Sequence, residues 1–139
     1  MSLRIFDVYG PDLKTGTVHS FLTQARDEHQ ITLHGKGYQT RTFLHQDDFL
    51  TAFDGMLKAY LEGATGIYNV GSPEEISLKR LADSCWQLTH KNSDTKIKHE
   101  PAPKDLRWWV LPDITRMRAV ANWSPRVSLR NGLWRMNHE

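Results

Sequence analysis

A turn with two closely spaced glycines, Gly35 and Gly37, constrains the fold of this 139-residue chain more than any other segment. Glycine adopts backbone angles that other residues avoid, so two glycines one residue apart indicate a tight turn. A short alternating run from Gln39 to His45 follows. Because residues two apart in a strand share a face, the side chains of Gln39 and Arg41 are expected to lie together beside the turn.

Two interpretations of Arg41 follow from this segment. The planar guanidinium group can bind two phosphate oxygens at once, which suits a phosphate ligand beside a loop whose backbone can approach closely. The alternative is an ordinary hairpin with a solvated arginine. The segment alone leaves both open.

Length and composition indicate one folded domain that covers residues 1–139. The chain is 39% apolar and 24% charged, which is typical of globular rather than disordered proteins. A formal charge of +2 gives little support to nucleic-acid binding. No run reaches the roughly 18 apolar residues of a membrane span, and no signal peptide is visible. The single cysteine, Cys85, excludes an internal disulfide and suits the cytoplasm.

Periodicity predicts an α/β fold of short strands and four or five helices. Asp47 or Asp48 is expected to cap the best helix, which ends at Gly63, and Asn122 to end another helix in a left-handed conformation. Strands are expected at 3–8, 31–34, 39–45, 66–70 and 95–99, and helices at 17–28, 48–62, 78–88, 114–121 and 129–134.

Five segments in a fixed order resemble the C-terminal half of extended short-chain dehydrogenase/reductases of the NAD-dependent epimerase/dehydratase family. The look-alikes are UDP-glucuronate decarboxylases and dTDP-glucose 4,6-dehydratases. The resemblance implies a partial Rossmann-like sheet with a small α/β substrate-binding subdomain. The segments are Arg4–Pro11, Phe43–Asp48, Ile67–Glu75, Pro112–Ile114 and Trp123–Leu133.

Two motifs of that family do not occur in these 139 residues. The nine glycines form no G-x-x-G-x-x-G turn for a dinucleotide, and no tyrosine has a lysine four residues later. We therefore expect a chain that lacks the N-terminal dinucleotide-binding half, binds no cofactor alone and is not catalytic alone. NAD(P) is expected in a complete family member. A domain cut from a longer protein and a naturally short reading frame both fit this expectation.

The resemblance also implies a set of ligand-binding residues. Arg41 and Arg107 would clamp the diphosphate of a nucleotide sugar, and Gln39 would line the nucleotide pocket. His34 stands where the family commonly has tyrosine, and Asn69 ends a strand at the sheet edge where ligands gather. Ordinary alternatives are a surface salt bridge for Arg41 and turn formation for Asn69.

Asp7 departs from the family pattern R-x-x-N-x-Y-G-P, in which asparagine donates a hydrogen bond to the ligand. An ionised aspartate cannot donate and repels a diphosphate. Three explanations remain open: the ligand is shifted, a cation meets the aspartate, or the site no longer binds the usual substrate. Gln46 is a second departure, because the family normally has valine there.

The leading hypothesis is the UDP- or dTDP-sugar-binding portion of an epimerase/dehydratase-like protein. One alternative is a non-catalytic interaction module that self-associates through uncovered strand edges. The other is a half-enzyme completed in trans by an NAD-binding chain. No metal site is expected, since the seven histidines include no pair with ligand spacing.

Overall fold

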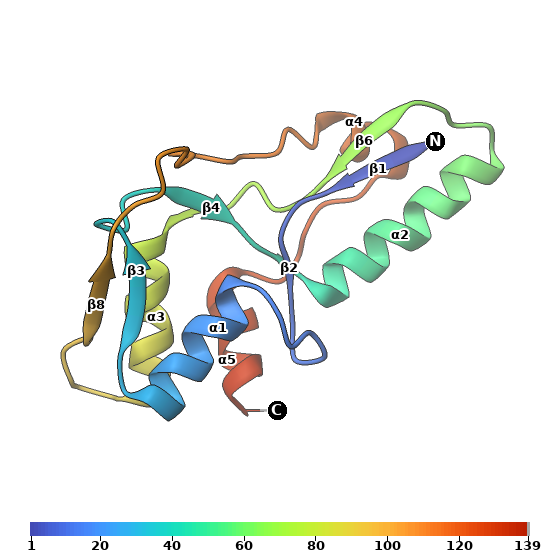
Figure 1. The fold of residues 1–139 in the computed structure, drawn as a ribbon. Coiled ribbons are helices and arrows are strands. Elements are labelled where there is room, and N and C mark those ends of the chain that lie inside the picture. Colours follow the sequence, from blue (N-terminus) through green and yellow to red (C-terminus); the bar gives the residue numbers. More distant parts are fainter. Residues whose placement is uncertain (139) are drawn as a thin grey trace.

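The computed structural model describes residues 1–138 as two lobes joined by a central crossing. Figure 1 shows the two lobes side by side, with the N-terminus in one and the C-terminal helix in the other. Each lobe has its own cluster of buried apolar side chains. The described residues contain four separate two-stranded sheets rather than one continuous sheet.

The α2 lobe is a parallel strand pair packed against two helices. Strand β1 pairs with β6 from Ser2 opposite Ile67 to Ile5 opposite Val70. Its elements are β1 (Ser2–Ile5), α2 (Gln46–Leu61), β6 (Ile67–Val70) and α4 (Thr115–Ala121). Its buried core consists of Leu44, Ala52, Met56, Tyr68, Val70, Ile114, Met117 and Trp123.

The α3 lobe packs three helices and a π-helical turn against a second parallel strand pair. Its elements are α1 (Thr17–Thr23), η1 (Gln24–Glu28), β3 (Ile31–His34), α3 (Leu78–Thr89), β8 (Ile97–Glu100) and α5 (Leu129–His138). Strands β3 and β8 run parallel with Ile31 opposite Ile97. The core includes Phe21, Ile31, Leu33, Leu81, Cys85, Trp86 and Leu133.

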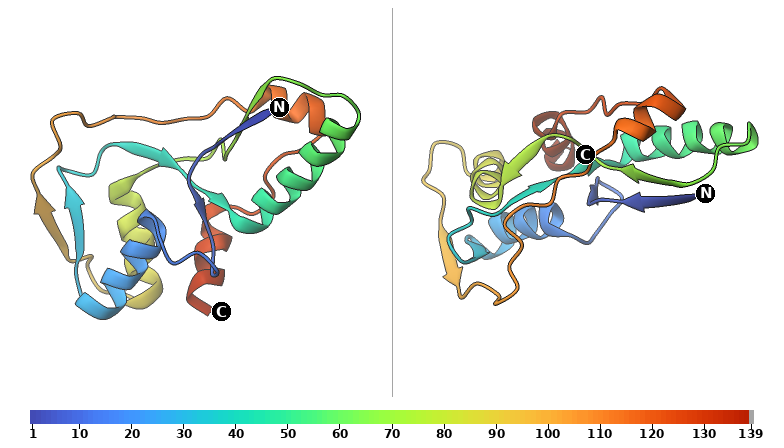
Figure 2. Two further views of the ribbon diagram at one scale, coloured as in Figure 1. Left: turned by 45° about the vertical axis from the view of Figure 1, so that its right-hand side comes forward. Right: turned by 90° about the horizontal axis from the view of Figure 1, so that it is seen from above.

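Short strands form the crossing between the lobes. Strand β2 (Val8–Tyr9) pairs in parallel with β5 (Leu44–His45), and β4 (Thr40–Thr42) pairs antiparallel with β7 (Glu75–Ser77). Figure 2 shows β4 running from the α3 lobe toward this crossing. The crossing thus joins residues 8–9 to 44–45 and residues 40–42 to 75–77.

The α/β class is confirmed, and so are the helices that periodicity predicted. Asn122 lies in the left-handed region with φ 49° after α4, and Ser77 caps α3 by accepting a hydrogen bond from Arg80 N at 3.2 Å. Asparagine and serine favour these positions because their short polar side chains satisfy the backbone locally. None of the helices within residues 1–138 combines the length and apolarity that crossing a bilayer needs.

The expected strand at 3–8 is wrong in one respect, because it is two strands. Phe6 N still bonds Val70 O of β6 at 2.9 Å, whereas Asp7 O accepts from Leu44 N at 2.8 Å. The chain therefore changes partner between residues 6 and 7. The expected 39–45 strand is likewise two strands, because β4 pairs with β7 whereas β5 pairs with β2.

The expected cap of α2 is also wrong. His45 is the N-cap, and its Nδ1 accepts from Asp47 N at 3.2 Å. Asp47 and Asp48 lie one step later, in the first turn, where their negative charge is favourable to the helix dipole.

Candidate functional site

The carboxyl ends of β1 and β6 meet beside the crossing, where ligands of open α/β sheets bind. Gly71 follows β6 and packs tightly, since a Cβ there would lie 2.8 Å from Pro112 Cγ and 3.0 Å from Phe6 Cβ. The lack of a side chain at residue 71 thus lets three segments converge. They are the ends of both strands and the end of the 101–112 loop.

Asp7 follows β1 at this edge, and Arg41 is the middle residue of β4. Asp7 is exposed and lies two residues after the end of β1, and desolvation raises the pKa of its carboxyl group. The positive charge of Arg41 opposes that rise, so the two side chains are close enough to interact electrostatically. Of the three explanations for Asp7, a nearby cation is consistent with this interaction, and all three stay predictions.

Arg41 is half-buried and only partly committed to the protein. Its Nη1 donates to Thr40 O at 2.6 Å, and no other hydrogen bond joins its guanidinium group to residues 1–138. An arginine has five N–H donors, so most of them stay available to a ligand. This arrangement can bind an oxyanion.

The strand that carries Arg41 is flanked on both sides. Arg41 lies opposite Ile76 of β7, and the Thr40 hydroxyl donates to the Glu75 carboxylate. On the other side, Thr40 N donates to Trp108 O at 2.8 Å, and a parallel bridge joins Thr40 to Trp109. The 101–112 loop therefore runs along β4.

That contact places Arg107 on the segment beside β4, one residue before Trp108. Arg107 is exposed, and no hydrogen bond or ion pair joins its side chain to the rest of residues 1–138. The sequence predicted that Arg107 shares a diphosphate with Arg41, and the neighbouring segments make this possible in space. Joint binding stays a prediction.

Gln39 and His34 lie on the other side of the glycine turn. Gln39 is buried, and its Nε2 donates to His34 O at 3.2 Å, which closes the turn. Both residues line a hollow of about 450 Å³ between α1, β3 and the start of α3. Neither Arg41 nor Arg107 lines that hollow. The turn explains Gln39 structurally, and a role in nucleotide binding stays a prediction.

Asn69 connects β6 to the start of α4. Its Nδ2 donates to Asp113 O at 3.1 Å, and its partner across the sheet is Arg4. Asp113 in turn accepts from Thr115 N at 2.9 Å, and hydrogen bonds from Thr115 lower the pKa of its carboxyl group. Asn69 therefore stabilises the segment before α4 in addition to lying near the end of β6.

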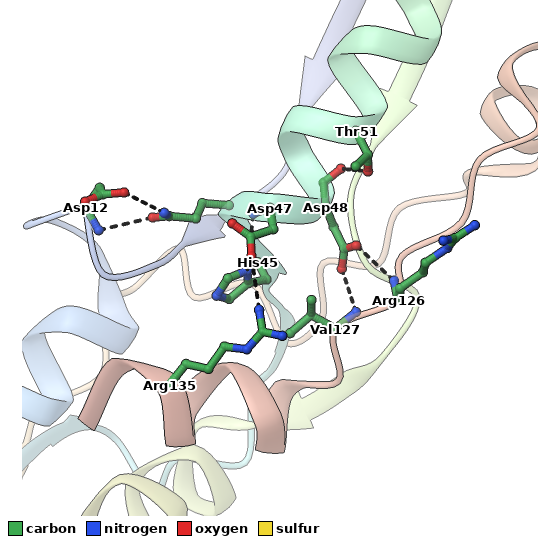
Figure 3. Close-up of polar contacts among 9 residues, drawn as sticks. Asp12, His45, Asp47, Asp48, Thr51, Arg126, Val127 and Arg135 are labelled. Carbon is green, nitrogen blue, oxygen red and sulfur yellow. Dashed lines mark hydrogen bonds and ion pairs between the residues drawn. The ribbon is translucent and has the colours of Figure 1, made fainter. Parts of the chain in front are cut away.

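Sequence reasoning missed a polar cluster at the N-terminus of α2 (Figure 3). Gln46, which was noted only as a departure, holds Asp12 through two hydrogen bonds. Its Oε1 accepts from Asp12 N at 3.1 Å, and its Nε2 donates to Asp12 Oδ2 at 2.7 Å. Asp47 Oδ2 lies 3.0 Å from Arg135 Nη1 and 3.7 Å from His45 Nδ1. These side chains, with Pro11 and Lys14, line a hollow of about 420 Å³.

Asp48 has a structural function in the same region. It is buried and accepts from Arg126 N at 3.0 Å and Val127 N at 2.8 Å, as Figure 3 shows. The two carboxylates Asp47 and Asp48 thus face different partners, which favours structural roles over paired acid–base catalysis. The sequence feature that could have indicated this polar cluster is Gln46, a polar residue at the start of α2 where the family normally has valine.

The comparisons with known proteins match this fold. The sequence profile of the NAD dependent epimerase/dehydratase family matches residues 1–71. UDP-glucuronic acid decarboxylase 5 of Arabidopsis thaliana is 34% identical over 94% of this chain and 38% of its own length. UDP-N-acetyl-alpha-D-glucosaminuronate decarboxylase of Bacillus cytotoxicus is 30% identical over 94% of this chain and 43% of its own length. The chain thus spans about two fifths of these relatives.

Solved structures share the fold at lower identity. The UDP-glucuronic acid 4-epimerase of Bacillus cereus, in complex with UDP-glucuronic acid and NAD, superposes with a TM-score of 0.86 at 23% identity. The match covers 98% of this chain and 43% of the epimerase. Epimerase Mth375 of Methanothermobacter thermautotrophicus gives a TM-score of 0.87 at 23% identity, over 98% of this chain and 41% of that protein. The fold is that of the C-terminal part of Rossmann-like epimerases.

Proposed function

Because this chain belongs to the NAD dependent epimerase/dehydratase family, we propose that it is the part of such a protein that binds a UDP- or dTDP-sugar. The relatives are named as decarboxylases of UDP-sugars, and a structural neighbour is described with UDP-glucuronic acid and NAD. The 139 residues hold neither the glycine-rich turn nor a Tyr-x-x-x-Lys pair. They therefore bind the nucleotide sugar without turning it over, and NAD belongs to the complete protein.

The observation that carries this proposal is the placement of Arg41. Its strand is fixed between β7 and the 101–112 loop, and most of its guanidinium donors have no partner within residues 1–138. A diphosphate offers the oxygens that such a group binds in a planar, two-bond arrangement. Arg107, on the flanking loop, is the second cation.

Asp7 sets the strength of this binding. An ionised carboxylate near Arg41 competes with a diphosphate for the guanidinium group, and desolvation raises the pKa of the Asp7 carboxyl group although the charge of Arg41 opposes the rise. We expect weak binding in this chain for that reason. Asn69, Gln39 and His34 are assigned to the nucleotide and sugar on the basis of the resemblance.

Calorimetric titration with UDP-glucuronic acid and UDP-glucose tests the proposal. Arg41→Ala is expected to weaken binding by about tenfold or more, since a hydrogen bond to a charged group contributes about 1.5–3 kcal/mol. Arg26→Ala is the matched control, because Arg26 is an exposed arginine of η1 that pairs with Asp27. Equal affinity in wild type and Arg41→Ala would count against the assignment.

A second function, association with another chain, rests on a separate observation. Strand β1 pairs only with β6 within the described residues, and the neighbouring face of α2 is apolar and exposed. An unpaired strand edge beside apolar side chains favours pairing with another chain. The exposed apolar side chains of this face are Leu50, Phe53, Leu57, Tyr60 and Leu61.

The partner is either a second copy of this chain or a separately encoded NAD-binding half. Sedimentation velocity over a wide concentration range distinguishes self-association, which Phe53→Asp is expected to weaken. A monomer at every concentration, together with no co-sedimentation with an NAD-binding half from a family member, would contradict association.

Because its one cysteine, Cys85, is buried and reduced, we place the protein in the cytoplasm.

A further inference from the structure

Two histidines that are 61 residues apart in sequence meet at one end of the α3 lobe. His29 follows η1 in the left-handed region with φ 56°, and His90 ends α3. Their Nδ1 and Nε2 atoms, respectively, lie 3.4 Å apart, and their rings are nearly perpendicular at 78°. No sequence spacing reveals this pair, because the fold alone brings the two elements together.

The ring of His90 is held in a defined orientation. It stacks on Trp86 with centroids 4.0 Å apart and an angle of 13°. Its Nδ1 lies 2.9 Å from Thr89 Oγ1. Thr89 Oγ1 also lies 3.1 Å from Trp86 O, so we assign its one proton to that bond and treat the hydroxyl as the acceptor for His90 Nδ1–H. The lone pair of His90 Nε2 therefore faces His29.

The separation of the two nitrogens matches the bite of a tetrahedral metal site. Two imidazole nitrogens at about 2.0–2.1 Å from one zinc ion, at a tetrahedral angle, lie about 3.3–3.4 Å apart. A ligating histidine commonly donates its other N–H to an oxygen that fixes the ring, and the Thr89 hydroxyl has that position here. The pair is thus arranged as metal ligands are.

We propose that His29 and His90 form a two-imidazole site for a divalent late transition metal ion such as Zn²⁺, Ni²⁺ or Cu²⁺. Imidazole nitrogen suits these ions. On binding, His29 carries its proton on Nε2 and turns the Nδ1 lone pair to the metal, so no net charge changes on the protein. Residues 1–138 contain no group of three or more acidic, histidine or cysteine ligands, so water completes the coordination shell.

Such a site links the end of η1 to the end of α3, and in a tetrahedral ion it leaves the other two coordination positions to exchangeable water. The bound ion therefore cross-links these two elements of the α3 lobe reversibly. Its two histidines follow η1 and α3, whereas Arg41 belongs to β4. The inference does not depend on nucleotide-sugar binding.

Calorimetry with ZnCl₂ and NiCl₂ on the protein without a histidine tag tests the site. Wild type is expected to bind one equivalent, and His29→Asn or His90→Asn to weaken binding by more than about tenfold. Thr89→Val is expected to weaken metal binding by about tenfold, because it removes the hydroxyl that orients the His90 ring. The Cu²⁺ electron paramagnetic resonance spectrum should show nitrogen coupling that both histidine variants lose.

His138→Asn is the matched control. His138 also stacks on a tryptophan one helical turn earlier, with centroids 4.3 Å apart, but its Nδ1 contacts Trp134 O rather than a second imidazole. This variant should bind as wild type does. Absence of binding in wild type, unchanged binding in His29→Asn, or loss in His138→Asn would each overturn the proposal. His29 is exposed, so circular dichroism should confirm that its variant folds.

Discussion

Helices α2 and α3 carry similar apolar stripes but have different surroundings. The stripe of α3 is enclosed by α1, α5 and β3, and Leu81 and Cys85 are fully buried. Helix α2 buries Ala52 and Met56 on one side, whereas Leu57 on the other side stays 46% exposed. The α3 lobe is thus complete within this chain, and the α2 lobe has one apolar side without a cover among residues 1–138. Figure 1 shows α2 at the outer side of its lobe.

The largest expected effect distinguishes the enclosed stripe from the exposed one. Leu81→Ala should lower the free energy of unfolding by about 2–5 kcal/mol, because it leaves a cavity in a closed core. Leu57→Ala should change it by no more than about 0.5 kcal/mol. Urea denaturation at low protein concentration measures both. A large loss in Leu57→Ala would show that the α2 face is covered in solution.

The next effect concerns the two neighbouring carboxylates at the start of α2. Asp48→Ala should cost about 1–3 kcal/mol, since the N–H groups of Arg126 and Val127 lose their acceptor. Asp47→Ala should cost at most about 1 kcal/mol, because its pair with Arg135 is exposed. Thermal unfolding of both variants checks the order. Equal losses would mean that Asp48 does not secure the segment before α5.

The smallest effect on stability is expected at Asp7, where the two lobes meet. The folded-state pKa is raised, so the contribution of this carboxyl group is fully present below its unfolded pKa of 3.8 and is lost as pH rises through the folded pKa. At pH 7 the ionised group is therefore unfavourable. Asp7→Asn should raise the free energy of unfolding by about 0.5 kcal/mol or less, because solvent screens an exposed group.

The gain in Asp7→Asn should shrink as the pH falls from 7 toward 4, which denaturation at several pH values measures. A gain that grows on acidification would contradict the direction of the pKa shift. The same variant restores an amide donor, so it should also strengthen the binding of UDP-glucuronic acid.

Local features of the sequence predicted more of this fold than distant contacts did. Helix α3 and the left-handed Asn122 followed from periodicity and propensity within one segment. The change of strand partner at Asp7 did not follow, because it depends on Leu44, which lies 37 residues further along. The cap by His45 was missed for a related reason, since aspartate is the commoner cap and His45 is instead buried against Tyr9.

In the candidate site, too, local features could be predicted from the sequence, whereas contacts between distant segments could not. The arginine after the glycine turn could be found from the sequence, as could the strand that carries it. The parallel contact of Thr40 with Trp109, which brings the Arg107 segment alongside, joins residues 69 apart and comes only from the fold. The His29–His90 pair is a second case of this kind.

The most direct test of the account compares uridine diphosphate with uridine monophosphate in calorimetric titrations of wild type, Arg41→Ala and Arg107→Ala. If Arg41 binds the second phosphate group, wild type should prefer the diphosphate by about tenfold or more, and Arg41→Ala should lose that preference while Arg26→Ala keeps it. Equal affinity of wild type for the two nucleotides, or an undiminished preference in Arg41→Ala, would contradict a diphosphate site on β4.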